Sequence, residues 1–198
     1  MQALVKRGKF VHMVNRSGKP SASTGAVLPA NVEICAGDAY NPQEVARLTE
    51  GAAVVYQGAQ PEYHEWQEKF PPLQAAILEG TATSGAKLVV IENLYAYGDP
   101  AGKPLTETTP YAPITRKGRV RLEMHEALMA AHRSGKVRVA LARASDYYGP
   151  GYMLTGEQIV LPAIAGKKAQ GVGSLDVPHT FTYTRDVGEA LAILGERD

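Results

Sequence analysis

The chain has 198 residues, of which 44% are hydrophobic and 21% charged, and this length is enough for one domain with a sizeable buried core. The formal net charge is +1, so composition gives no reason to expect nucleic acid or an anionic membrane as a partner. The apolar runs are too short to span a bilayer, and the first residues show no signal-peptide pattern. A single cysteine rules out an internal disulfide, and together these features predict a cytoplasmic protein.

Strand-like and helix-like segments alternate along the chain, which is typical of a parallel sheet covered by helices. Residues 2–7 are expected to be the tail of a helix that ends at Gly8. The predicted strands cover residues 9–14, 31–35, 52–56, 87–91 and 137–141. The fourth of them is apolar on both faces, which predicts a central place in the sheet.

The predicted helices cover residues 41–48, 62–84, 115–134, 156–165 and 186–194, and a short extended piece is expected at 181–183. Asn41 and Pro42 suit the cap and first turn of the first of these helices. Pro71 and Pro72 should kink the second helix or split it in two. We therefore expect one α/β domain over residues 1–198.

Four stretches of the chain carry distinctive residues, and their order and spacing form a pattern. They are residues 89–98 with the pair Tyr97-Gly98, residues 110–124 with a Pro-rich lead and Glu123, residues 143–151 ending in Tyr148-Gly149-Pro150-Gly151, and residues 179–191 with Thr182-Tyr183-Thr184-Arg185-Asp186-Val187. Together they resemble the NAD-dependent epimerase/dehydratase family, in the extended branch of the short-chain dehydrogenase/reductase superfamily. This resemblance implies a Rossmann-type parallel sheet with helices on both faces, an NAD(P) cofactor, and a small-molecule carbonyl or nucleotide-sugar substrate.

Two parts of the family pattern are missing from the 198 residues. Family members begin with a strand and a Gly-x-x-Gly-x-x-Gly turn, whose backbone amides approach the cofactor pyrophosphate, and no such turn occurs here. The family's C-terminal substrate region is also incomplete. We therefore expect a segment of a longer protein, with the first strand missing from its sheet and with weak dinucleotide binding or none.

The catalytic positions of the family carry different residues in this chain. The family uses Tyr-x-x-x-Lys, in which the tyrosine exchanges a proton with the substrate oxygen. When Glu123 is matched to the family, the tyrosine position falls on Thr115, the lysine position on Arg119 and the preceding Ser/Thr position on Asn93. Threonine is too weak an acid and arginine does not lose its proton, so the usual relay is absent. Tyr95, just after the fourth strand, is the candidate for a displaced acid, with Arg119 lowering its pKa and Asn93 binding a substrate oxygen.

The turns after the first three predicted strands supply the candidate cofactor contacts, which are Asn15, Arg16, Ser17, Asp38, Ala39, Gln57, Gly58 and Ala59. Arg16 suits the 2′-phosphate of NADP, although it could equally be a solvated turn residue. Asp38 could contact adenine or could bond its own backbone. Gly58 would let the backbone approach a cofactor. NADP is the expected cofactor, with NAD as the alternative.

A non-catalytic NADP-sensing or regulatory protein is the rival interpretation, and an inactive fragment is another. The resemblance also implies a homodimer that pairs through residues 62–84 and 115–134. His64, His125 and His132 lie among charged residues on predicted helices, so we expect surface histidines and no metal site.

Overall fold

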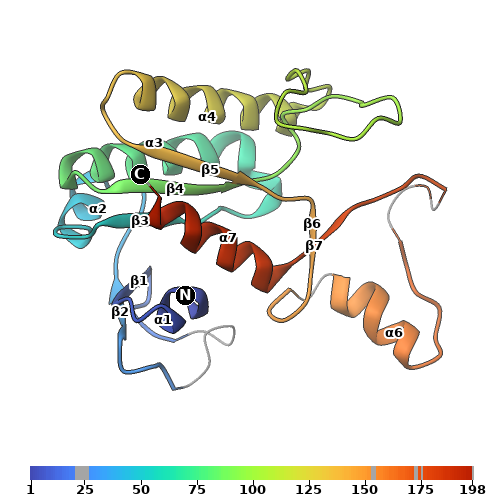
Figure 1. Ribbon diagram of the computed structural model, residues 1–198, viewed down its shortest axis with the longest axis horizontal. Helices are drawn as coiled ribbons and strands as arrows, with labels where there is room; N and C mark the ends of the chain where they lie inside the picture. The colour runs from blue at the N-terminus through green and yellow to red at the C-terminus, as the bar shows by residue number, and fades with distance from the viewer. Residues whose placement is uncertain (21–26, 153–154, 172–173, 175, 198) are drawn as a thin grey trace.

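The computed structural model describes residues 1–198 except 21–26, 153–154, 172–173, 175 and 198 (Figure 1). Its helices are α1 (Gln2–Lys6), α2 (Pro42–Leu48), α3 (Trp66–Ser84), α4 (Arg116–Arg133), α6 (Leu161–Ile164) and α7 (Thr184–Glu196). Its strands are β1 (Val11–Asn15), β2 (Val32–Ala36), β3 (Val54–Gln57), β4 (Lys87–Glu92), β5 (Val139–Arg143), β6 (Asp146–Tyr148) and β7 (Phe181–Tyr183). A 3₁₀ turn over Tyr63–Glu65 precedes α3, and a π-helical turn over Gly156–Val160 precedes α6.

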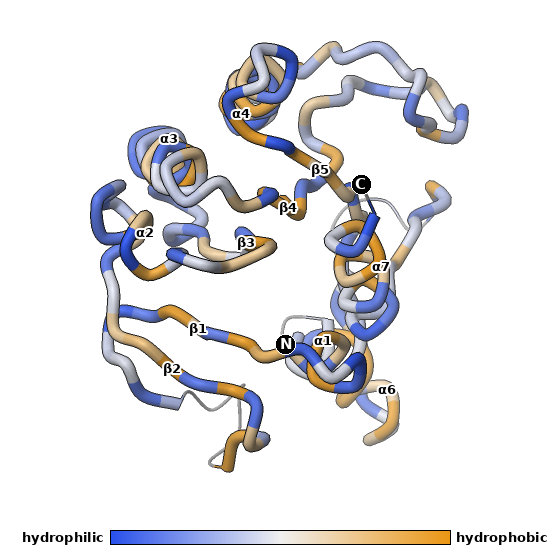
Figure 2. Tube along the Cα trace, turned by 60° about the vertical axis from the view of Figure 1, so that its left-hand side comes forward, coloured by the Kyte–Doolittle hydropathy of each residue, from blue (hydrophilic) through white to orange (hydrophobic). Residues whose placement is uncertain are grey.

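All strand pairs among the described residues are parallel, which confirms the predicted α/β fold of the Rossmann type. The strands do not form one continuous sheet, however, because they divide into β1–β2, β3–β4–β5 and β6–β7. Figure 2 shows β2, β1, β3, β4 and β5 following one another across the molecule. Doubly wound folds have the strand order 3-2-1-4-5-6, counted along their own chains. In that order, the place between β1 and β3 of this chain belongs to the first strand of the fold, which is the strand we expected to be missing.

The core is built around β4, which has a hydrogen-bonded neighbour on each side. Leu88, Val89 and Val90 are at most 1% exposed, which confirms the predicted central strand. Helices α3 and α4 pack on one face of the β3–β4–β5 group, and Leu128 of α4 is fully buried. Helix α7 covers the other face (Figure 1).

Capping residues set the helix ends where the sequence indicated them. The Asn41 side chain accepts hydrogen bonds from the backbone N–H groups of Gln43 and Glu44 at the start of α2. Helix α3 ends at Gly85, whose φ of 73° is the left-handed conformation that glycine adopts without strain.

Helix α3 runs without interruption through Pro71 and Pro72, so a split into two helices is wrong. The prolines lie in its second turn, where their missing N–H groups remove at most two hydrogen bonds of the helix. Phe70, Leu73 and Ile77 of the same helix are buried in the core, and this burial stabilises the continuous form.

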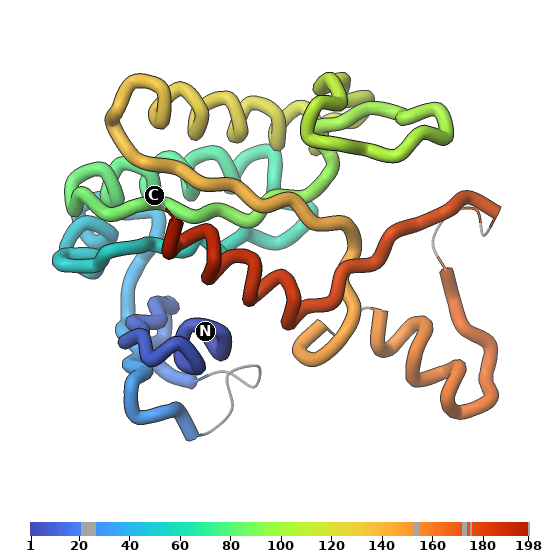
Figure 3. The backbone as a smooth tube through the Cα atoms, in the orientation of Figure 1, coloured from blue at the N-terminus to red at the C-terminus, as the bar shows by residue number. Residues whose placement is uncertain are grey.

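The parallel pair β6–β7 was only half expected, because residues 146–148 gave no strand pattern. Strand β6 pairs with β7 more than thirty residues later, and the Ser145 and Thr182 hydroxyl groups lie 2.8 Å apart beside this pair. Figure 3 shows that the segment carrying α6, which lies between β6 and β7 along the chain, projects away from the strands. Among the helices of the described residues, none combines the length and apolar character needed to cross a membrane.

Candidate functional site

A pocket of about 540 Å³ lies where the loop after β4 meets the start of α4. It is lined by Tyr63, Leu94, Tyr95, Tyr97, Gly98, Asp99, Ile114, Thr115, Arg116 and Lys117. Ligand sites of open α/β sheets lie beyond the carboxyl ends of the strands, and this pocket occupies such a position next to β4.

Two close backbone contacts shape the wall of the pocket. A Cβ atom on Gly98 would lie 2.4 Å from the carbonyl oxygen of Ala112, next to the bridge between Tyr97 and Tyr111. A Cβ atom on Gly118 would lie 2.5 Å from the carbonyl oxygen of Tyr95. Only glycine fits at these two positions, so the sequence fixes how closely the loop approaches α4.

Tyr95 projects into the pocket and keeps 38% of its surface exposed. Its hydroxyl group lies 3.3 Å from that of Tyr63, and the Lys117 ammonium lies 3.8 Å from the centre of the Tyr63 ring. Burial, followed by the hydrogen bond with Tyr63, raises the pKa of Tyr95 above its usual value. The expectation that Arg119 lowers this pKa is wrong, since Arg119 lies on the exposed side of α4.

The side-chain oxygens of Thr115 and Asn93 are both engaged by the backbone nearby. The Thr115 hydroxyl caps α4 by accepting a hydrogen bond from the Gly118 N–H group at 2.9 Å. The Asn93 amide oxygen accepts a hydrogen bond from the Tyr95 N–H group at 3.2 Å. Thr115 lines the pocket and Asn93 holds the turn that leads to Tyr95, so the structure gives each of them a positioning task.

The turn after β1 is organised by Asn15, whose side-chain oxygen accepts hydrogen bonds from the N–H groups of Ser17 at 3.1 Å and Gly18 at 2.7 Å. Arg16 remains exposed on this turn. After β2, the Asp38 carboxylate accepts a hydrogen bond from the Tyr40 N–H group at 3.0 Å, as in the alternative of a turn aspartate. Ala39 is partly buried and packs against the core.

The turn after β3 provides a test of whether a dinucleotide fits these residues. Gln57 is 6% exposed, and its side-chain oxygen is buried without a hydrogen-bond partner. A Cβ atom added to the neighbouring Gly58 would meet no atom within 4 Å, and Ala59 is exposed. An unused acceptor beside open backbone fits a ligand that donates hydrogen bonds, and the exposed Arg16 fits a phosphate. These residues fit part of a dinucleotide, while the sequence contains no glycine-rich cradle for its pyrophosphate.

A buried charged network, which the sequence did not predict, lies beneath the pocket. The Glu92 carboxylate accepts a hydrogen bond from Arg143 Nε at 3.0 Å and lies 3.2 Å from His125 Nδ1. Arg143 also donates to the hydroxyl groups of Tyr97 at 2.8 Å and Tyr111 at 2.7 Å. The network therefore ties β4, β5 and α4 to both ends of the loop that borders the pocket.

The expected surface position of His125 is wrong, because this residue is only 7% exposed. The inward face of α4 carries it to Glu92, Arg143 and the Tyr111 hydroxyl group, which lies 3.1 Å from its Nε2 atom. A sequence signal for the network does exist. Glu92 and Arg143 each end an apolar strand, and their Cα atoms are partners in the β4–β5 register.

The described residues contain no group of three or more His, Cys, Asp or Glu side chains that could hold a metal ion. Helices α3 and α4, expected to form a dimer interface, pack against each other. Their outward sides carry charged residues such as Lys69 and Glu123, and the exposed large hydrophobic residues of the described chain lie on other segments. The homodimer stays a prediction.

Solved structures with similar folds include nucleotide-sugar enzymes. The chain superposes with a TM-score of 0.76 and 15% identity on UDP-N-acetylglucosamine 4-epimerase from Bacillus cereus, covering 99% of this chain and 66% of that one. It superposes on UDP-glucuronic acid 4-epimerase from Bacillus cereus, in complex with UDP-glucuronic acid and NAD, with a TM-score of 0.78 and 19% identity, covering 99% of this chain and 69% of that one. For UDP-N-acetylglucosamine 4-epimerase from Methanobrevibacter ruminantium M1 the TM-score is 0.78 and the identity 13%, and the match covers 96% of this chain and 66% of that one. At these identities the likeness shows the fold, and the chain spans about two thirds of the length of these structures.

No curated protein matches the sequence significantly. The sequence model of the NAD dependent epimerase/dehydratase family, in contrast, matches residues 1–198, which is the whole chain. This match agrees with the parallel strands, the helices on both faces and the pocket after β4. The chain belongs to the NAD dependent epimerase/dehydratase family.

Proposed function

We propose that these residues form the dinucleotide-binding part of an NAD(P)-dependent oxidoreductase that acts on a carbonyl or nucleotide-sugar substrate, with Tyr95 in place of the usual Tyr-x-x-x-Lys pair. The observation that carries this proposal is the pocket after β4, into which the Tyr95 side chain projects. Membership in an NAD dependent family supports the cofactor, and the UDP-sugars named for the similar structures support the substrate class.

The chemistry requires a proton donor next to the reacting carbonyl group. A bound NAD(P)H supplies the hydride that adds to the carbonyl carbon, and the carbonyl oxygen takes up a proton. Tyr95 holds its proton at neutral pH, as an ordinary tyrosine does and as its raised pKa also requires, so it can donate a hydrogen bond and then the proton. The Lys117 ammonium, which lies over the ring of the adjacent Tyr63, stabilises the negative charge left by the proton transfer.

The test is oxidation of NADPH by the longer protein with a panel of UDP-sugars and simple carbonyl compounds. Tyr95→Phe should lower kcat by about 10²–10⁴-fold, the usual contribution of general acid catalysis, and should leave NADPH affinity unchanged. Tyr148→Phe is the matched control, because Tyr148 is 42% exposed and lies outside the residues that line the pocket. Full activity in Tyr95→Phe would remove Tyr95 from the mechanism.

A non-catalytic NADP-binding protein is the second candidate. It is favoured by the residues that stand where the family has its catalytic tyrosine and lysine. The Thr115 hydroxyl caps a helix, and Arg119 lies on an exposed surface. Such a protein would bind NADPH and would oxidise none with any member of the panel. In either case Arg16→Glu should weaken NADPH binding more than NADH binding, since Arg16 is the candidate contact of the 2′-phosphate.

A further inference from the structure

Tyr111 has an arrangement of partners that the proposed function does not use. It lies on the loop between β4 and α4, where a β-bridge joins it to Tyr97 (Figure 1). It is 38% exposed, and its hydroxyl group lies 3.1 Å from Nε2 of the buried His125 of α4. A hydroxyl group within hydrogen-bond reach of a histidine can lose its proton to that histidine as it reacts.

Glu92 sets which nitrogen of the His125 ring carries the proton. Its carboxylate oxygen lies 3.2 Å from His125 Nδ1, and because a carboxylate only accepts hydrogen bonds, Nδ1 is the protonated nitrogen. Nε2 then presents its lone pair to the Tyr111 hydroxyl group. The Arg143 Nη2 atom lies across both ring nitrogens, at 3.1 Å from Nδ1 and 3.4 Å from Nε2, and therefore faces the ring without selecting one of them.

The same arginine supports negative charge on the Tyr111 oxygen, because Arg143 Nη2 donates a hydrogen bond to it at 2.7 Å. Arg121 adds a second positive charge beneath it. Arg121 is 3% exposed, and the charges of Glu92 and Arg143 act on it. Its Nε atom has no hydrogen-bond partner among the described residues. The cluster of Arg121, Arg143 and Glu92 therefore holds two guanidinium groups for one carboxylate, and this excess stabilises the negative charge that forms on the Tyr111 oxygen as its proton leaves.

Tyr95 of the pocket has different surroundings. Its hydroxyl group faces another phenol, that of Tyr63, at 3.3 Å, and burial raises its pKa. The Tyr111 oxygen is instead in contact with an imidazole base and a guanidinium group. A hydroxyl group, an imidazole and a carboxylate in series repeat the arrangement of nucleophile, general base and orienting group that serves acyl transfer on unrelated folds.

We propose that Tyr111 is a nucleophilic hydroxyl group that accepts an acyl group from an activated ester, with His125 as its general base and Glu92 as the carboxylate that orients the base. The Tyr111 oxygen forms a bond to the carbonyl carbon of the ester, and His125 Nε2 takes up the phenol proton. The bond from the carbonyl carbon to the leaving oxygen breaks, and the leaving group departs with the electron pair. This proposal does not depend on cofactor binding or on Tyr95.

The probe is 4-nitrophenyl acetate, reacted with the 198-residue chain at neutral pH, and the measurement is the rate of acetylation at each tyrosine by peptide mass spectrometry. Tyr148 is the internal reference, because it is 42% exposed and its ring packs on Tyr183. Tyr111 should be acetylated about 100-fold faster than Tyr148, which is the lower end of what general base catalysis contributes. The rate at Tyr111 should also be lower in heavy water than in ordinary water, because a proton moves as the new bond forms.

His125→Gln removes the base and keeps a polar side chain of similar size, so it should lower the rate at Tyr111 to that at Tyr148 and abolish the effect of heavy water. His64→Gln is the matched control, because His64 is exposed, and it should leave both rates unchanged. Circular dichroism checks that both variants fold, and the comparison of Tyr111 with Tyr148 in the parent chain tests the proposal even without them. Equal rates at the two tyrosines of the parent, or an unchanged rate at Tyr111 in folded His125→Gln, would overturn the proposal.

Discussion

Arg143→Met tests the buried network beneath the pocket. Arg143 is the main cationic partner of Glu92, which is 5% exposed, and it also binds the hydroxyl groups of Tyr97 and Tyr111. Methionine keeps much of the side-chain length and removes the guanidinium. The Glu92 carboxylate would then remain buried without its ion-pair partner, with His125 beside it and the charge of the buried Arg121 still acting on it.

The size of the effect follows from these contacts. Breaking a buried ion pair by removing one partner costs about 3–5 kcal/mol, and each lost hydrogen bond to a tyrosine hydroxyl costs about 1 kcal/mol. The Arg143 side chain is 16% exposed, so water replaces some of what is lost. We expect a loss of about 4 kcal/mol in the free energy of unfolding, which for a chain of this length lowers Tm by roughly 8–16 °C.

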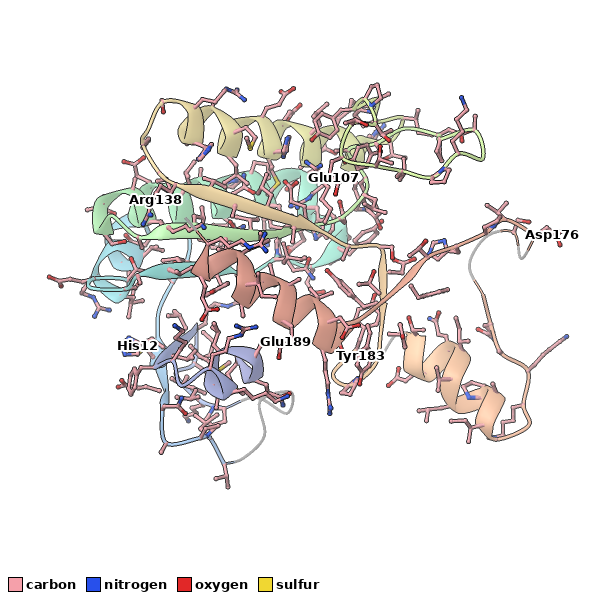
Figure 4. All side chains as sticks on the ribbon, viewed as in Figure 1. His12, Glu107, Arg138, Asp176, Tyr183 and Glu189 are labelled. Atoms are coloured by element: carbon pink, nitrogen blue, oxygen red, sulfur yellow. The ribbon has the colours of Figure 1, made fainter. Side chains whose placement is uncertain are left out.

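Urea unfolding at pH 7, followed by circular dichroism, measures this loss. Arg138→Met is the matched control, because Arg138 is exposed, and it should change stability by less than about 0.5 kcal/mol (Figure 4). Adding Glu92→Gln to Arg143→Met should recover part of the stability, since the unpaired buried charge is then gone. A loss below about 1 kcal/mol in Arg143→Met, or no recovery in the double variant, would refute the reasoning.

Three further predictions concern the walls of the pocket. Thr115→Ala should cost about 1 kcal/mol in urea unfolding because the α4 cap is lost, and Thr115→Ser should retain the stability; equal losses would contradict the cap. Gly118→Ala should lower the free energy of unfolding by about 1–3 kcal/mol, because the new Cβ atom meets the Tyr95 carbonyl. In the control Gly156→Ala the new Cβ atom meets nothing within 4 Å, so this variant should be tolerated. A larger loss in Gly156→Ala than in Gly118→Ala would disprove the contact. The raised pKa of Tyr95 adds stability that is fully present below about pH 10, the ordinary tyrosine pKa, and that is lost as the pH rises through the pKa of the folded protein. Above about pH 10, Tyr95→Phe should therefore lose less stability than the parent as the pH rises. Parallel curves of stability against pH for the two proteins would count against this prediction.

Local patterns in the sequence were sufficient to predict most elements of the fold. The apolar run at residues 88–91 predicted the buried central strand, and Asn41 with Pro42 predicted the start of α2. The division of the strands into separate groups is different in kind. It depends on which strand lies between β1 and β3, and no local periodicity carries that information.

The site was less predictable because its properties arise from contacts between distant residues. Tyr95 was identified by its place after β4, but the rise in its pKa comes from burial and from Tyr63, thirty-two residues earlier. Glu92 and His125 look like ordinary charged residues in the sequence. Their burial is possible only because Arg143, fifty-one residues after Glu92, supplies the opposite charge.

The most direct test of the proposed function is calorimetric titration of NADPH into the 198-residue chain and into a longer protein that carries the glycine-rich turn. The longer protein should bind with a Kd of about 1–100 μM, and the 198-residue chain should bind at least tenfold more weakly, since the turn supplies backbone donors to the pyrophosphate. Equally tight binding by the 198-residue chain would contradict the role given to the turn. No binding by the longer protein would contradict the proposal that these residues form a dinucleotide-binding domain.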